Sequence, residues 1–345
     1  MTTAKTNPGR FFEDYTVGEI IPHAVPRTVS GGERALYHAL YPARHALYSS
    51  DEFARACGLP RSPLDDLAAF HLVFGKTVPD ISLNALANLG YAEGKWLKPV
   101  YPGDTLHSSS QIIGLKQNSN GKSGIVWVRT IGRNQRNEAV LSYVRWVMVR
   151  KRDAQTPAPE TVIPDLAPVI DPADLTIPER LDFSNYNFTL AGEPHRWGDY
   201  EIGEKIDHVD GVTVEEAEHM LATRLWQNTA KVHFDATLRE DGKRLIYGGH
   251  VISMARALSF NGLANAQIIT GLNGGSHANP CFSGDTIKAW SEVLDKAETN
   301  APGVGALRLR LVATKGGAPF ALKGEDGKYL AHVLLDLDYW ALVPI

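Results

Sequence analysis

The chain contains an internal repeat, and this feature constrains its fold more than any other. The heptad EDYTVGE at residues 13–19 recurs as GDYEIGE at 198–204, an offset of 185 residues (198 − 13). Further along, VYPGDTL at 100–106 recurs as CFSGDTI at 281–287, an offset of 181 residues (281 − 100). Two matches in the same order and at nearly the same offset indicate a duplicated unit of about 150 residues.

The segment between the two copies predicts a linker. Residues 151–180 contain six prolines, at positions 157, 159, 164, 168, 172 and 178. Proline fixes φ and has no amide N–H, so such a segment is extended and belongs to neither a helix nor a sheet. We therefore expect an N-terminal unit at 1–150, a linker at 151–185 and a C-terminal unit at 186–345.

Each copy has the same coarse order of predicted elements. In 63–77, Leu64, Leu67, Ala68 and His71 recur with helical spacing, and 248–262 is the corresponding helix of the second copy. Period-two patterns then predict strands at 124–134, 139–151, 305–315 and 329–340, while NGGSHANP at 273–280 is interpreted as a connection. One long helix with several antiparallel strands, occurring twice, predicts an α+β fold in which a curved sheet wraps each helix.

A loop in the second copy carries the candidate chemistry. The motif PVYPGDTL at 99–106 and the loop LWQNTAKVHFDA at 225–236 resemble the MaoC-like enoyl-CoA hydratases, and the duplication resembles their double-hotdog form. Members of that family carry a D-x-N-P-L-H loop followed by a helix that opens with glycine. In this chain Asn228 falls on the Asp, His233 on the His and Gly249 on the glycine. The loop wording is most similar to the subgroup of mesaconyl-CoA hydratases.

The resemblance implies a lyase that reversibly hydrates mesaconyl-C1-CoA to β-methylmalyl-CoA. His233 would be the acid/base, because an imidazole switches protonation near neutral pH. Unpaired amides at the start of a helix would stabilise the thioester oxygen as it gains charge, with Gly249 as donor and Gly248 beside it. Asn228 either positions the water or caps the loop, and both alternatives stay open.

The substrate carboxylate of such a reaction needs a cation or several donors. Lys231 in the loop and Arg256 in the following helix are the first candidates, and Arg44 in the first copy is a further one. Lysine in a loop is nevertheless more often a solvated side chain than a ligand.

The first copy has lost the catalytic residue types. With the offset of 185, Asn228 corresponds to Ala43, His233 to Tyr48 and Gly249 to Leu64. A tyrosine of ordinary pKa is a poor base at neutral pH. We therefore expect one active site per chain, in the C-terminal unit, with the catalytically degenerate N-terminal unit as scaffold and substrate tunnel.

The composition of the chain limits the kinds of partner that it is expected to bind. A net charge of −4 without a basic stripe argues against nucleic acid, and no apolar run reaches the length of a membrane helix. The lack of an apolar run near the N-terminus and the presence of only two cysteines predict a cytoplasmic enzyme. We expect no metal and no cofactor, coenzyme A being part of the acyl-CoA substrate, and the resemblance implies a homodimer.

Three other functions fit the same residues. They are hydration of another branched or dicarboxylic enoyl-CoA, thioester hydrolysis, which the same fold supports, and acyl-CoA binding without catalysis. Thioester hydrolysis is disfavoured because the helix at 248–262 has no carboxylate.

Overall fold

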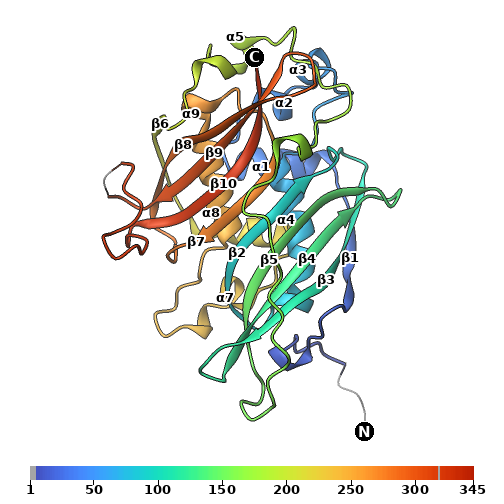
Figure 1. Cartoon of the computed structure of the whole chain (residues 1–345), viewed down its shortest axis with the longest axis vertical. Helices are drawn as coiled ribbons and strands as arrows, with labels where there is room; N and C mark the ends of the chain where they lie inside the picture. Colours follow the sequence, from blue (N-terminus) through green and yellow to red (C-terminus); the bar gives the residue numbers. More distant parts are fainter. Residues whose placement is uncertain (1–4, 318) are drawn as a thin grey trace.

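The computed structural model describes residues 5–317 and 319–345, so the first four residues of the expected N-terminal unit lie outside it. Its strands form one ten-stranded antiparallel sheet in the order β1-β3-β4-β5-β2-β7-β10-β9-β8-β6 (Figure 1). The strands are β1 (Ile20–Thr28), β2 (Ala85–Trp96), β3 (Thr105–Gln117), β4 (Ser123–Arg133), β5 (Ala139–Arg150), β6 (Lys205–Thr213), β7 (Ile268–His277), β8 (Thr286–Glu298), β9 (Val304–Thr314) and β10 (Val333–Pro344).

Helices lie along one side of this sheet (Figure 1). They are α1 (Gly31–Leu40), α2 (Ala46–Ser49), α3 (Asp51–Ala56), α4 (Asp66–Thr77), α5 (Phe188–Ala191), α6 (Glu216–Leu225), α7 (Lys231–Phe234), α8 (Gly248–Leu258) and α9 (Phe260–Leu263). Single turns occur at Phe12–Asp14, Val78–Ser82, Pro172–Asp174, Trp197–Asp199 and Ala236–Leu238.

The central helices α4 and α8 form where the sequence predicted the long helices. Helix α4 starts at Asp66 because the Asp65 side chain accepts from the Leu67 N–H at 2.9 Å and caps the helix. All residues of α4 are buried, and so are all residues of α8 after Gly248. A helix that is buried on every side belongs inside a fold, so each is wrapped by its own half of the sheet.

The two copies join through the pairing of β2 with β7. Tyr91 pairs with Gly275 and Ala92 with Gly274, which makes the sheet continuous between the halves. The interpretation of 273–280 as a connection is therefore wrong for its first part, because β7 runs to His277. The glycines in this strand interrupt the alternation of apolar and polar residues from which a strand would be predicted. A Cβ on Gly275 would lie 2.8 Å from Leu337, so neighbouring strands fill the space that a side chain would take.

The proline-rich segment crosses the face of the sheet opposite the helices, shown as the green trace in Figure 1. Val162 forms a bridge with Leu115 of β3, and the Ile170 N–H donates to Asn273 of β7 at 2.8 Å. Ile170 is also buried. The segment thus packs against both halves of the molecule.

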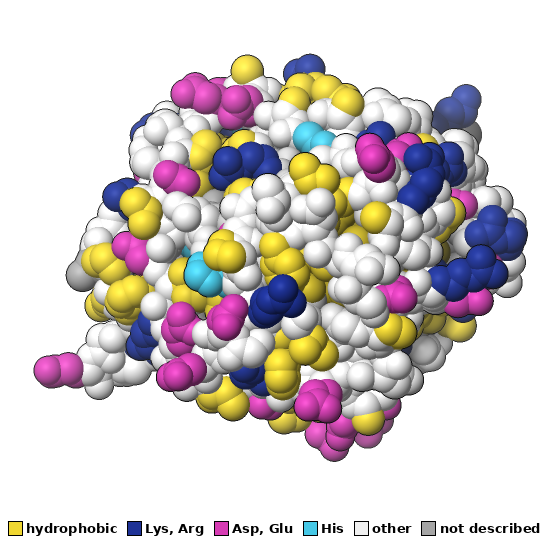
Figure 2. Space-filling view, turned by 90° about the horizontal axis from the view of Figure 1, so that it is seen from above, with side chains coloured by type: hydrophobic (Ala, Val, Ile, Leu, Met, Phe, Trp, Pro, Cys, Tyr) yellow, Lys and Arg dark blue, Asp and Glu magenta, His cyan; other side chains and the backbone are white. Residues whose placement is uncertain are grey.

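Charges are mixed over the surface in Figure 2, where acidic and basic side chains alternate without a basic stripe on the visible face. Within the described residues, no helix combines the length and the apolar character needed to span a membrane.

Candidate active site

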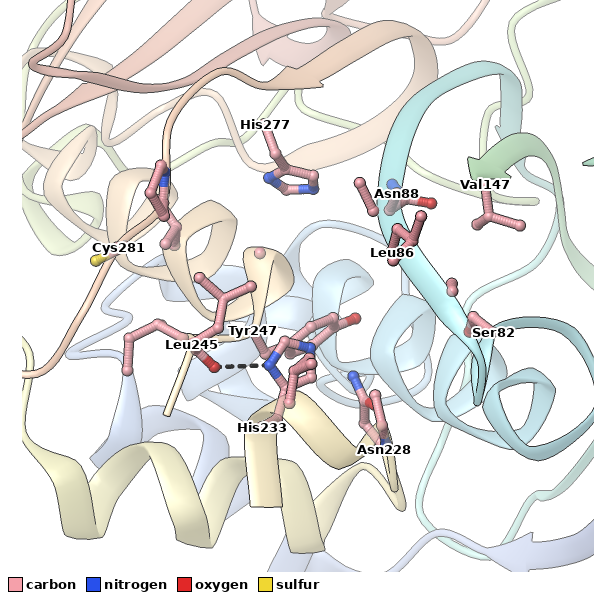
Figure 3. A pocket seen from close by; sticks show the side chains of 18 of the residues that line it. Ser82, Leu86, Asn88, Val147, Asn228, His233, Leu245, Tyr247, His277 and Cys281 are labelled. Atoms are coloured by element: carbon pink, nitrogen blue, oxygen red, sulfur yellow. Dashed lines mark hydrogen bonds between the residues drawn. The ribbon is translucent and has the colours of Figure 1, made fainter. Parts of the chain in front are cut away.

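A cavity of about 270 Å³ lies between the two halves of the chain. Its N-terminal wall comes from α4, the turn after it, β2 and β5, and its C-terminal wall from the loop around α7, the start of α8, the end of β7 and the segment that follows (Figure 3). Polar groups on these walls come from Ser82, Asn88, Tyr91, Arg145, Asn228, His233, Tyr247, His277 and Asn279. The loop predicted from sequence therefore faces the first copy of the repeat.

His233 lies in α7. One nitrogen of its ring is hydrogen-bonded to the backbone, and the other is free to contact a ligand. Its Nδ1 donates to the Leu245 carbonyl at 2.7 Å, shown by the dashed line in Figure 3. Since a carbonyl only accepts, the tautomer is fixed with the lone pair on Nε2, which has no hydrogen-bond partner among the described residues. Burial lowers the pKa of His233 to about 4, partly offset by the Leu245 carbonyl. The imidazole is therefore neutral at pH 7 and its Nε2 lone pair can accept a proton, but the lowered pKa makes it a weaker base than the imidazole titrating near neutral pH that the sequence analysis expected.

Two backbone amides are available at the start of α8. The Tyr247 N–H donates to His219 at 2.9 Å, while the His250 and Val251 amides donate to the Tyr247 carbonyl. Gly248 and Gly249 lie between these residues in sequence. The amide N–H of each has no acceptor in residues 5–317 and 319–345. Such N–H groups carry the positive end of the helix dipole and suit an oxyanion.

A side chain at either of these two positions would have to displace a neighbouring ring. A Cβ on Gly248 would lie 2.4 Å from the His277 ring, and one on Gly249 would lie 2.5 Å from the Tyr247 ring. Gly248 lines the cavity directly, while Gly249 is the next residue of the helix and is buried. The sequence analysis assigned the donor role to Gly249, but of the two glycines Gly248 is the one that lines the cavity.

The side chain of Asn228 makes the hydrogen bond expected of a loop cap, and its role toward water stays a prediction. Its side chain is buried and its Oδ1 accepts from the Ala230 N–H at 3.2 Å, which holds the loop. Its Nδ2 has no partner in the described part of the chain, and the residue lines the cavity beside His233 (Figure 3). One end of the amide caps the loop and the other is free for a ligand.

The three cations predicted to bind the substrate carboxylate do not line this cavity. Lys231 is exposed on α7. Arg44 is exposed and stacks on the Phe260 ring at 4.4 Å. Arg256 is buried and donates to the Ser259 hydroxyl at 3.0 Å and to the Ala266 carbonyl. Its guanidinium is thus hydrogen-bonded near the C-terminal end of α8, away from the glycines at the start of the helix.

Two residues that the sequence analysis did not select do line the cavity. His277, at the end of β7, shares a hydrogen bond with the Tyr91 hydroxyl at 3.1 Å, and burial lowers its pKa to about 4. Arg145 lies in β5 and is fully buried. A signal for Arg145 existed, because the alternation in β5 places it on the same buried face as Tyr143 and Val147.

The corresponding place in the first copy has been filled. Tyr48 of α2 donates to the Asp66 carboxylate, which also accepts from the Ile269 N–H at 2.7 Å, and the space beside them is about 20 Å³.

The N-cap residues of the two long helices are Asp65 for α4 and Tyr247 for α8, and they are 182 residues apart (247 − 65). Gly248 thus matches Asp66, which corrects the match of Gly249 with Leu64.

The described residues contain neither a candidate metal-ligand group nor a disulfide. In the described ranges no group of three or more His, Cys, Asp or Glu is arranged to hold a metal ion. Cys57 and Cys281 are free, buried thiols.

Solved structures define the class to which this fold belongs. A MaoC domain dehydratase from Chloroflexus aurantiacus superposes with a TM-score of 0.97 at 57% identity, covering 99% of each chain. A double-hotdog protein of Mycobacterium tuberculosis superposes with a TM-score of 0.74 at 23% identity, covering 97% of this chain and 98% of the other, and so shares the fold. The molecule is a MaoC-like double hotdog, as the repeat and the loop predicted.

Comparison of the sequence with known proteins assigns the chain to a narrower family than the solved structures do. The pattern of the mesaconyl-CoA hydratase family matches residues 2–318. The chain is 78% identical over 341 residues to mesaconyl-CoA hydratase of Cereibacter sphaeroides, and 57% identical over 348 residues to beta-methylmalyl-CoA dehydratase of Chloroflexus aurantiacus, covering 99% of both chains in each case. The chain belongs to the mesaconyl-CoA hydratase family.

Proposed function

We propose that this chain catalyses the reversible addition of water to mesaconyl-C1-CoA, giving β-methylmalyl-CoA. The observation that carries the proposal is the pairing, in one cavity, of an imidazole with a free Nε2 and a helix start with two free amides. Water addition to an unsaturated thioester needs both groups. The names of the two relatives, a mesaconyl-CoA hydratase and a beta-methylmalyl-CoA dehydratase, and the match to the family support the choice of substrate.

The proposed reaction uses His233 twice. The thioester oxygen accepts hydrogen bonds from the Gly248 and Gly249 amides, while Nε2 of His233 accepts a proton from the attacking water. The water oxygen bonds to Cβ, and the electron pair of the double bond moves into the thioester enolate. The imidazolium then returns its proton to Cα, so one water is added and the enzyme is restored. The Asn228 Nδ2 group donates a hydrogen bond to the water oxygen.

The test is a spectrophotometric assay with mesaconyl-C1-CoA, because absorbance of the conjugated thioester falls on hydration. Wild-type protein should consume the absorbance without releasing free thiol. His233→Ala should lower kcat by about 100-fold or more, the usual contribution of a general acid–base. The control is His195→Ala, an exposed histidine outside the cavity, which should retain activity. Full activity of His233→Ala, or thiol release by the wild type, would contradict the proposal.

The assembly and compartment complete the proposal. We propose a homodimer on the basis of the family resemblance, to be measured by light scattering coupled to size-exclusion chromatography. A cytoplasmic location is supported by the two buried free thiols, since oxidising compartments favour disulfides. The proposed chemistry uses water and protein groups alone, without a metal or cofactor.

A further inference from the structure

We propose that Arg145 binds the free carboxylate of the acyl group and so makes the cavity selective for dicarboxylic acyl-CoA thioesters. This inference rests on the proposed function, because it assigns a residue to the part of mesaconyl-C1-CoA that simple enoyl-CoA substrates lack. It names a specificity residue in place of Lys231, Arg44 and Arg256, which do not line the cavity.

Arg145 is a buried cation without an anionic partner. Its side chain is 0% exposed, and no carboxylate of the described residues lies within ion-pair distance of it. Its Nη2 donates to the Thr77 hydroxyl at 2.8 Å and to the Ser82 hydroxyl at 3.3 Å. Its Nε is buried without an acceptor, and no hydrogen bond reaches its Nη1 among the described residues. Half of the guanidinium fork is therefore unused.

A buried guanidinium of this kind is costly to maintain. Charges removed from water are normally paired, and lone buried charges in proteins are concentrated at functional sites. The titratable groups nearest to Arg145 are tyrosines, whose phenols are neutral at pH 7 because burial raises their pKa: Tyr15, Tyr91, Tyr143 and Tyr247. The missing counter-ion is thus expected from a ligand, and a planar fork with free donors matches a carboxylate.

The position of Arg145 relative to the proposed chemistry fits the shape of the substrate. The guanidinium lies over the Phe74 ring, 4.2 Å from its centroid. The Phe74 ring lies 5.6 Å from that of Tyr247, which in turn lies 5.8 Å from the ring of His233. In mesaconyl-C1-CoA the carboxylate is bonded to the carbon that water attacks. A thioester held at Gly248 with Cβ toward His233 can direct that carboxylate across the cavity to β5.

Asn88 is placed to assist. It lies on β2, the neighbour of β5 in the sheet, and it lines the same cavity (Figure 3). Both polar atoms of its amide are buried without a partner. A carboxylate held by Arg145 has spare lone pairs for one further donor.

Binding of unreactive analogues tests this assignment separately from catalysis. The probes are 2-methylsuccinyl-CoA with its thioester at C1, the saturated analogue of the substrate, and 2-methylbutyryl-CoA, in which a methyl group replaces the carboxylate. Arg145→Met should raise the Kd of the first by about 100-fold, as expected for loss of a buried charge partner. The Kd of the second should change by less than about threefold. The matched control is Arg150→Met, an exposed arginine on the same strand, which should change neither.

The outcomes separate the two proposals. Equal weakening of both analogues, or unchanged binding of 2-methylsuccinyl-CoA, would overturn the role of Arg145 whether or not the wild type hydrates mesaconyl-C1-CoA. Failure of the hydration assay with selective binding intact would overturn the proposed function alone. If Arg145→Met does not unfold cooperatively, Arg145→Gln, which keeps a hydrogen-bonding group, is judged by the same ratio of Kd values.

Discussion

Asn228 stands where the resembling hydratases carry an aspartate, and the proposed substrate would account for the amide. In the proposed reaction the substrate carries its own carboxylate on the carbon that water attacks, and this carboxylate would lie close to Nδ2 of Asn228. Two unit charges about 4 Å apart repel by roughly 4 kcal/mol at an effective dielectric near 20. The amide avoids this repulsion and still offers a donor to the water, while its Oδ1 holds the loop at Ala230.

Asn228→Asp should therefore weaken binding of mesaconyl-C1-CoA by at least about tenfold. Crotonyl-CoA has no carboxylate and should be affected much less. The measurement is the ratio of kcat/KM for the two substrates in the variant and in the wild type. An equal effect on both substrates would show that the amide serves the loop and not the charge balance of the site.

At the scale of elements, the loop that carries Asn228 is in contact with a helix of the other copy. Gly75, near the end of α4, lies against the backbone of the loop that leads to α7. A Cβ built on Gly75 would lie 1.8 Å from the Trp226 carbonyl oxygen and 3.3 Å from the Asn228 nitrogen. The N-terminal unit thus supports the position of Asn228, although it has lost the catalytic residue types itself.

Gly75→Ala should destabilise the protein and lower kcat, since the loop backbone must move away from α4. The sign is informative, because glycine to alanine inside a helix ordinarily stabilises it by about 1 kcal/mol. Urea denaturation and the hydration assay measure the two effects. Gly31→Ala in α1 is the control, because nothing lies within 4 Å of a Cβ at that position. A Gly75→Ala variant as stable and active as the control would refute the contact.

At the scale of the whole molecule, burial of neutral histidines should make folding sensitive to acid. Burial lowers the pKa of the ring to about 4 or below in His71, His208, His219, His233, His250 and His277. Below the ordinary histidine pKa of about 6.5 the unfolded chain binds protons that the folded chain refuses. Stability from these groups is complete above pH 6.5 and is lost as the pH falls toward 4.

Asp66 acts in the opposite direction, since burial raises the pKa of its carboxyl to about 8 and favours folding at lower pH. Asp65 shifts the same way, but the histidines outnumber these two acids. The free energy of unfolding should therefore be smaller at pH 5 than at pH 7. Urea titrations at the two pH values measure it, and a larger value at pH 5 would contradict this account.

The sequence by itself determined the double unit, the long helices and the identity of the candidate loop. These depend on local spacing and on the repeat, both of which are written along the chain: the heptads, the helical stripe at Leu64 and Leu67, and the contrast of His233 with Tyr48. The family and the double-hotdog fold predicted from them are confirmed. The roles assigned to His233 and Gly249 stay predictions.

Only the tertiary structure decided which residues face His233 across the cavity. Arg145 and His277 are far apart in sequence, and both line the cavity because β2 pairs with β7 and brings the two halves into one sheet. Lys231, Arg44 and Arg256, the cations selected from sequence, do not line the cavity. Periodicity predicts which face of a strand is buried but not which distant strand it meets. That is set by the contact of one whole copy with the other.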